Sequence, residues 1–196
     1  MQKTLPRYFP YLPRIAEITN VHCGPATLEM LFENIGVRVS QDEIVEAAGS
    51  SLKRLRRYGM SMGETALAVR RISSSSQFWM KDNCEISDLR ALLDRGIPVG
   101  VEWQGEFLQY SDEDNGHYSI VTHLDGDKIY IADPYEHFAG RDRRLELDRF
   151  EELWWDTNEL RDMETGKMIL VKDHHMIFII TSKEDTFPEE LGMIRA

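Results

Sequence analysis

Apolar residues in the first third of the chain recur with the period of an α-helix. Counted from position 28 they fall at i, i+3, i+4 and i+7, on one helical face: Leu28, Leu31, Phe32 and Ile35. Pro25 fits the first turn of such a helix, where its missing N–H has no intrahelical partner, and Gly36 suits a left-handed cap after the last turn. The pattern therefore predicts a helix that begins near Cys23.

Three more helices are predicted before residue 100. Ser40-Gln-Asp-Glu43 has the residues of a capping box, which opens a short helix that closes at Gly49. Apolar stripes predict the other two over residues 63–72 and 85–95. The basic stretch Lys53-Arg-Leu-Arg-Arg57 is interpreted as a solvated helix face or a loop.

The second half of the chain is dominated by short apolar runs typical of strands. Strands are predicted at residues 78–80, 97–103, 117–123, 127–133, 168–172 and 175–181, with one more helix near 148–155. Pro98 indicates either an edge strand or the first position of a strand. Because helices come first and strands later, the order predicts an α+β fold with helices packed on one side of an antiparallel sheet.

The length of 196 residues fits one domain, and we expect a single domain over residues 1–196 with an irregular, proline-broken segment at 1–16. Leu, Ile, Val and Phe make up about a quarter of the chain, which excludes intrinsic disorder. The longest uninterrupted apolar run, Met176 to Ile180, is far shorter than the roughly 20 residues that cross a bilayer. We therefore expect no association with a membrane.

The formal net charge is −11, which disfavours a nucleic-acid partner, because binding to a phosphate backbone needs dense positive charge. The first residues lack the apolar core of a signal peptide, so a cytoplasmic location is expected. In that compartment Cys23 and Cys84 stay reduced. No pattern in the sequence specifies an oligomeric state.

Cys23 is the candidate nucleophile. At the N-terminus of the first predicted helix, free amides and the helix dipole favour a thiolate, while Gly24 and Pro25 clear space for a substrate. The alternative is that Cys23 is a small buried hydrophobe. Cys84 lies in a predicted loop between a strand and a helix and is interpreted as structural.

A thiol nucleophile needs a base, and His117 is the candidate among six histidines. It opens a β-branched strand directly after a polar loop, whereas the other five equally fit solvated or satisfied histidines. Asp173-His-His175 has no spacing typical of a metal site, so no metal is expected there. The acidic stretch Asp112-Glu-Asp114 is either a flexible polar loop or a feature that favours cationic substrates.

The register of the hairpin decides whether Asp133 can orient His117. A three-residue loop, Leu124-Asp-Gly126, places the two residues directly opposite each other on one face. A two-residue loop, Asp125-Gly126, shifts the pairing by one residue and places them on opposite faces. The sequence permits both loops, and Asp133-Pro134 also fits a simple end of the strand.

Three segments in combination resemble the signature blocks of C39-like, papain-type cysteine peptidases: Cys23-Gly-Pro-Ala-Thr-Leu-Glu-Met30, Gly116-His-Tyr-Ser-Ile-Val121 and Asp127-Lys-Ile-Tyr-Ile-Ala-Asp-Pro134. The resemblance covers most of residues 17–135. It implies a papain-like fold in which an N-terminal helical part packs on an antiparallel sheet. It also implies that Cys23 is the nucleophile, His117 the base and Asp133 the group that orients it, with no organic cofactor or metal.

The same resemblance implies an oxyanion-hole glutamine six residues before the nucleophile, where this chain has Glu17. An ionised carboxylate cannot donate a hydrogen bond to an oxyanion. Either Glu17 is protonated, or Asn20 or the backbone amide of Cys23 replaces it, or activity is weak.

We therefore expect a hydrolase that cleaves a peptide or small amide through a thioester on Cys23. One alternative is an acyltransferase or amidase with the same three residues. Another is an inactive relative that binds peptides. Trp103, Trp154 and Trp155 are expected in the core rather than in a substrate cleft.

Overall fold

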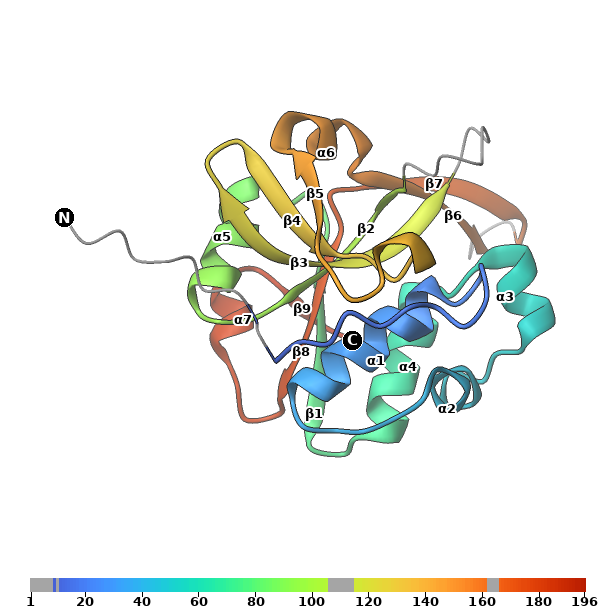
Figure 1. Cartoon of the computed structure of the whole chain (residues 1–196). Coiled ribbons are helices and arrows are strands. Elements are labelled where there is room, and N and C mark those ends of the chain that lie inside the picture. Colours follow the sequence, from blue (N-terminus) through green and yellow to red (C-terminus); the bar gives the residue numbers. More distant parts are fainter. Residues whose placement is uncertain (1–8, 10, 106–114, 162–165) are drawn as a thin grey trace.

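The computed structural model describes residues 9, 11–105, 115–161 and 166–196. Figure 1 shows helices on both sides of a twisted sheet. The helices are α1 (Cys23–Asn34), α2 (Gln41–Ala47), α3 (Leu52–Tyr58), α4 (Met62–Ile72), α5 (Ile86–Asp94), α6 (Leu147–Leu153) and α7 (Phe187–Glu190), with one 3₁₀ turn at Glu136–Phe138. Within this described part of the chain, no helix combines the length and the apolarity needed to cross a bilayer.

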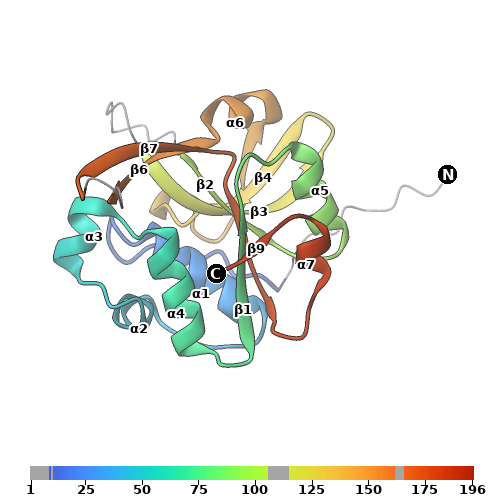
Figure 2. The same cartoon turned by 180° about the vertical axis from the view of Figure 1, so that it is seen from behind.

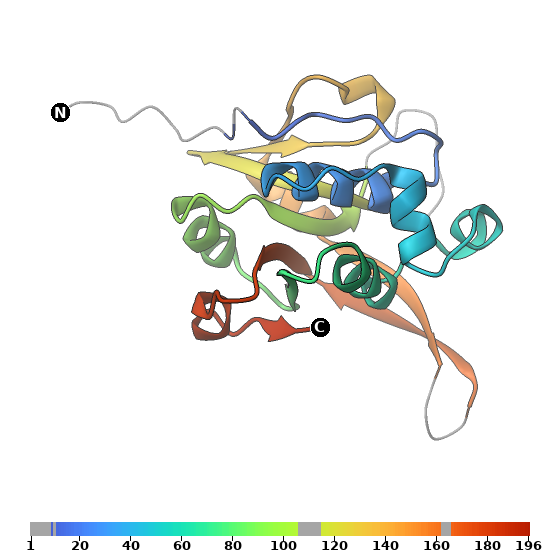
Figure 3. The same ribbon diagram turned by 90° about the horizontal axis from the view of Figure 1, so that it is seen from below.

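One antiparallel sheet has the strand order β5-β4-β3-β2-β8-β1-β9. Its strands are β1 (Ser76–Lys81), β2 (Val99–Gln104), β3 (Gly116–Asp125), β4 (Lys128–Ala132), β5 (Arg143–Glu146), β8 (Ile177–Ser182) and β9 (Ile194–Arg195). Seen from behind, β9 pairs with β1 beside α7 (Figure 2). A separate hairpin of β6 (Trp155–Arg161) and β7 (Met168–His174) extends away from this sheet (Figure 3).

The predicted helices are confirmed within one or two residues, because their caps act locally. Ser40 and Glu43 form the expected capping box, and Gly36 has a φ of +78° after α1. The basic stretch is helical as α3, whose N-cap Ser51 accepts a hydrogen bond from the backbone of Arg54. Its single buried side chain, Leu55, anchors α3 and leaves the basic residues outside.

The sheet buries apolar side chains on both faces, which differs from the one-sided packing that element order predicted. Adjacent strand residues such as Phe78 and Trp79 are both buried and belong to different apolar clusters. Since side chains alternate along a strand, each face needs its own cover. Helices α1, α2 and α4 cover one face, and α5 and α6 cover the other.

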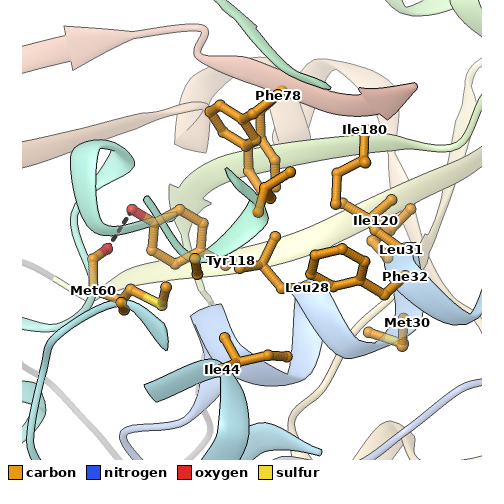
Figure 4. Packing of buried hydrophobic residues seen from close by; sticks show 14 of the residues in the cluster. Leu28, Met30, Leu31, Phe32, Ile44, Met60, Phe78, Tyr118, Ile120 and Ile180 are labelled. Atoms are coloured by element: carbon orange, nitrogen blue, oxygen red, sulfur yellow. Dashed lines mark hydrogen bonds between the residues drawn. The ribbon is translucent and has the colours of Figure 1, made fainter. Parts of the chain in front are cut away.

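The cluster beneath α1 joins the helical part to the sheet (Figure 4). Leu28 and Phe32 of α1 pack against Ile120 of β3 and the neighbouring strands. Tyr118 lies in the same cluster, and its hydroxyl donates a 2.7 Å hydrogen bond to the carbonyl of Met60. This packing fixes the position of α1 relative to β3.

The observed hairpin register agrees with neither predicted loop. Asp125 pairs with Lys128, so the turn consists of Gly126 and Asp127, with Gly126 at a φ of +59°. A bulge between Val121 and His123 then shifts the pairing by one residue. Pro98 directly precedes β2, which lies between β3 and β8, so the first-position interpretation is the one that holds.

Candidate active site

Cys23 is the first residue of α1 and is partly exposed. No side chain caps the N-terminus of this helix, and its first turn contains no acidic residue. The positive end of the helix dipole therefore acts on the Cys23 sulfur without a competing carboxylate on the helix itself.

His117 lies at the start of β3 and is hydrogen-bonded to Asp133, which directly follows β4. Nε2 of His117 donates to Oδ1 of Asp133 over 2.7 Å, and both side chains are buried. Burial lowers the pKa of His117, but the charge of Asp133, the hydrogen bond to it and a side-chain hydrogen bond with Cys23 raise the pKa to about 10. The imidazole is therefore protonated at neutral pH, beside the thiol.

The Asp133 carboxylate has two further partners. Its Oδ1 accepts from the backbone N–H of Tyr135 at 2.9 Å, and its Oδ2 accepts from Nη1 of Arg143 at 2.9 Å. Burial opposes ionisation, yet His117, Tyr135 and Arg143 together lower the pKa of Asp133. Arg143 carried no signal in the sequence, because a single arginine in a charged stretch is typical of a surface strand.

Glu17 lies next to this pair because the N-terminal segment is tied to both halves of the fold. The backbone N–H of Glu17 donates to the carbonyl of Pro134 at 2.8 Å. The neighbouring Ile18 donates to the side chain of Gln41 on α2 at 2.9 Å. Asn20, the proposed substitute, is exposed.

The carboxyl of Glu17 is held in an unusual state. Burial raises its pKa to about 7, against the opposing effects of the His117 charge and a backbone hydrogen bond from His22. Its Oε2 is buried and has no hydrogen-bond partner among the described residues. At neutral pH about half of the molecules therefore carry a protonated Glu17.

A model of the Peptidase_C39 like family matches residues 7–161, which include Glu17, Cys23, His117 and Asp133. The chain belongs to this family. Two relatives are uncharacterized proteins of Methanothermobacter marburgensis and Methanothermobacter thermautotrophicus. The first is 30% identical over 120 residues, which are 61% of this chain and 70% of the relative. The second is 27% identical over 112 residues, which are 57% of this chain and 64% of the relative.

Solved structures of C39 peptidases share the fold. A protein from Bacillus anthracis described as a C39-like peptidase superposes with a TM-score of 0.62 and 15% identity, covering 90% of this chain and 98% of the other. A second similar structure is the peptidase domain of Streptococcus ComA, a bi-functional ABC transporter involved in a quorum sensing pathway. It superposes with a TM-score of 0.58 and 16% identity, covering 86% of this chain and 97% of the other. These similarities establish the papain-like fold of this C39-like chain.

A buried polar cluster lies behind the C39-like site. Glu102 of β2 is buried, and its Oε2 has no hydrogen-bond partner among the described residues. Burial raises the pKa of Glu102, an effect that interactions with Asp156 of β6 and Tyr118 of β3 only partly oppose. Asp156 also packs so closely on Gly116 that a Cβ at that position would lie 2.3 Å from its carboxylate. The cluster thus supports the strand end that carries His117.

The remaining candidates lie in the core or away from the site. Cys84 is buried, and burial raises the pKa of its thiol to about 12, as suits a structural cysteine. His175 stacks on Trp154, and its Nδ1 lies 2.8 Å from the carbonyl of Cys84. Trp103 and Trp154 are buried, while Trp155 is half-buried.

The sequence also raised the questions of a metal site and of the role of the acidic stretch at 112–114. Among the described residues, no group of three His, Cys, Asp or Glu side chains could hold a metal ion. The acidic stretch at 112–114 lies outside the described residues.

Proposed function

We propose that this C39-like chain is a cysteine peptidase that acts through Cys23, His117 and Asp133. The observation that supports it is the position of His117, whose Nε2 is hydrogen-bonded to Asp133 and whose ring interacts electrostatically with Cys23. A nucleophile, its acid–base partner and an orienting carboxylate are the parts that acyl transfer needs.

The proposed reaction has two halves. The Cys23 thiolate attacks the carbonyl carbon of a peptide or small amide, and an S–C bond forms. His117 gives its proton to the leaving nitrogen as the C–N bond breaks, which leaves a thioester on Cys23. His117 then takes a proton from water as the water oxygen attacks, and the S–C bond breaks to release the acid. Asp133 holds the ring throughout.

Glu17 in its protonated form is the proposed oxyanion donor. A neutral carboxyl has one O–H to donate, which an ionised one lacks. The buried Oε2 of Glu17 and the raised pKa of this carboxyl support the assignment. Loss of one such donor costs about 3–4 kcal/mol of transition-state stabilisation. Activity is therefore expected to follow the protonated fraction of Glu17.

The ionised fraction of Glu17 is also the reason to keep a second candidate, an inactive relative that binds peptides. An acyltransferase on the same residues is distinguished by the acceptor, since it would transfer the acyl group to an amine in preference to water. A cytoplasmic location belongs to the same proposal, because both cysteines are free thiols, which a reducing compartment preserves.

Selective alkylation tests the nucleophile with Cys84 as an internal control. The protein is treated with iodoacetamide between pH 5 and 9, and modification of each cysteine is followed by peptide mass spectrometry. Cys23 is expected to react about 100-fold faster than Cys84, because it is partly exposed and lies beside an imidazolium. Equal, slow modification of both would contradict catalysis.

Turnover is tested with a denatured-protein digest and with peptide amides, in the presence and absence of hydroxylamine as an acceptor. Wild-type protein is expected to produce new peptide ends, and the Cys23→Ala variant to produce none. A hydroxamate product formed without hydrolysis would favour the acyltransferase. Binding without any product would favour the inactive relative.

A further inference from the structure

Arg143 is a buried cation that the proposed reaction does not use directly. It lies on β5, beside β4 in Figure 1, with only 6% of its side chain exposed. Its Nη1 donates to Oδ2 of Asp133 over 2.9 Å. The guanidinium is also packed against two aromatic rings, 5.0 Å from the centroid of Trp103 and 4.8 Å from that of Phe138.

The fold holds this guanidinium in a fixed place. Arg143 pairs with Ile131, two residues before Asp133 on the neighbouring strand. The two rings restrict the planar group, and attraction between the cation and the rings stabilises it there. The Asp133 carboxylate is therefore bound at both oxygens, with Oδ1 toward His117 and Oδ2 toward Arg143.

We infer that Arg143 is a positioning residue of the site, which fixes the rotation of the Asp133 carboxylate and moderates its hold on the His117 proton. The inference rests on the proposed function for its effect on turnover, but its effect on His117 is independent of turnover. The Asp133 carboxylate thus lies between two cations, the imidazolium of His117 and the guanidinium of Arg143.

The direction of the effect follows from these charges. Without Arg143, its positive charge no longer offsets the effect of the Asp133 carboxylate on His117, so the imidazolium persists to higher pH. Glu17, which faces His117 from the N-terminal segment, has the same sign as Asp133 and does not compensate. An imidazolium that holds its proton more tightly is a poorer acid toward the leaving nitrogen, so kcat falls. KM stays nearly constant, because a buried Arg143 does not touch substrate.

The test compares Arg143→Met and Arg143→Lys with Arg144→Met as a control. Arg144 is the exposed neighbour of Arg143 on β5. The titration of His117 is followed by NMR of the imidazole carbons, with the resonance assigned by its absence in His117→Asn. The pH dependence of Cys23 alkylation and, where there is turnover, kcat and KM are measured on the same proteins.

In Arg143→Met the midpoint of the His117 titration is expected to rise by on the order of one pH unit, and kcat to fall about tenfold. Arg143→Lys keeps the charge and is expected to titrate like wild type, with a smaller loss of kcat. Arg144→Met is expected to change neither.

A folded Arg143→Met protein with an unshifted His117 titration would overturn the inference. Should that variant not fold, Arg143→Lys decides: wild-type turnover and alkylation would overturn the positioning role, and a selective fall in kcat would support it. If wild type itself has no turnover, the proposed function fails, whereas the His117 titration still judges the role of Arg143.

Discussion

The side chains of His117 and Asp133 lie on the same face of the β3–β4 hairpin because β3 contains a one-residue bulge. The turn register, continued along the hairpin, would pair Asp133 with Ile120 and leave His117 on the other face. The bulge at Thr122 moves the pairing by one residue, so Ile120 pairs with Ala132 instead. Because strand side chains alternate with a period of two, this shift by one residue places His117 and Asp133 on the same face.

The Asp133 carboxylate is expected to be irreplaceable even by its amide. Both of its oxygens accept hydrogen bonds from buried donors on His117 and Arg143, and Asn has only one acceptor oxygen. Asp133→Asn is expected to lower kcat/KM roughly 100-fold or more and to lower the free energy of unfolding by about 3 kcal/mol. Peptidase kinetics and urea titration measure the two effects. Asp127→Asn, at an exposed site in the turn, is the control, and an Asp133→Asn protein with wild-type values would refute the assignment.

The oxyanion assignment predicts a distinctive pH profile. The pKa of Glu17 is raised to about 7, mainly by burial, so its protonated form declines above neutral pH. Wild-type kcat/KM is expected to fall about tenfold from its plateau by pH 8, where about a tenth of Glu17 is protonated. Glu17→Gln donates at every pH and is expected to remove this decline. The control is Glu33→Gln, on the exposed side of α1, which should leave the pH profile unchanged. If Glu17→Gln also leaves the profile unchanged, another group stabilises the oxyanion.

The buried Glu102 predicts that stability depends on pH. Burial raises the pKa of Glu102, so its carboxyl stays protonated in the fold at a pH where it ionises in the unfolded chain. Ionisation favours the unfolded state, so this group lowers the free energy of unfolding as pH rises above its unfolded pKa. Relative to wild type, Glu102→Gln is expected to gain stability progressively from pH 4 to pH 8. Guanidinium titrations at pH 4, 6 and 8 measure the gain, with Glu46→Gln on α2 as an exposed control. A constant difference at all three pH values would mean that the pKa of Glu102 is the same in the folded and unfolded chain, which contradicts this prediction.

Gly100 is required by close packing rather than by backbone conformation. A Cβ at this position would lie 2.3 Å from the ring of Phe178, on the strand paired with β2. Gly100→Ala is expected to lower the free energy of unfolding by about 1–3 kcal/mol. Gly63→Ala in α4 meets no atom within 4 Å and is expected to raise it by up to about 1 kcal/mol. Thermal unfolding measures the change in midpoint for each variant. Equal changes for Gly100→Ala and Gly63→Ala would contradict the close contact between Gly100 and Phe178.

Local signals were sufficient to predict the helices and to single out the candidate residues of the proposed site. A capping box such as Ser40-Gln-Asp-Glu43 acts within four residues, so its effect can be predicted without knowing the rest of the fold. Cys23, His117 and Asp133 were proposed from short motifs around each residue, and in the structure His117 is hydrogen-bonded to Asp133 and interacts electrostatically with Cys23. The strands β5, β6 and β9 were missed because charged or short segments become strands only when a neighbour pairs with them.

The order of residues along the chain thus accounts for where helices begin, which segments are apolar and which side chains have suitable chemistry, since each depends on neighbours a few positions away. Long-range contact settles the rest. The bulge in β3, the burial of Glu17 and the partnership of Arg143 with Asp133 all arise when segments distant in sequence pack together. Packing removes water from these groups and thereby sets their charge, and no local pattern contains that information.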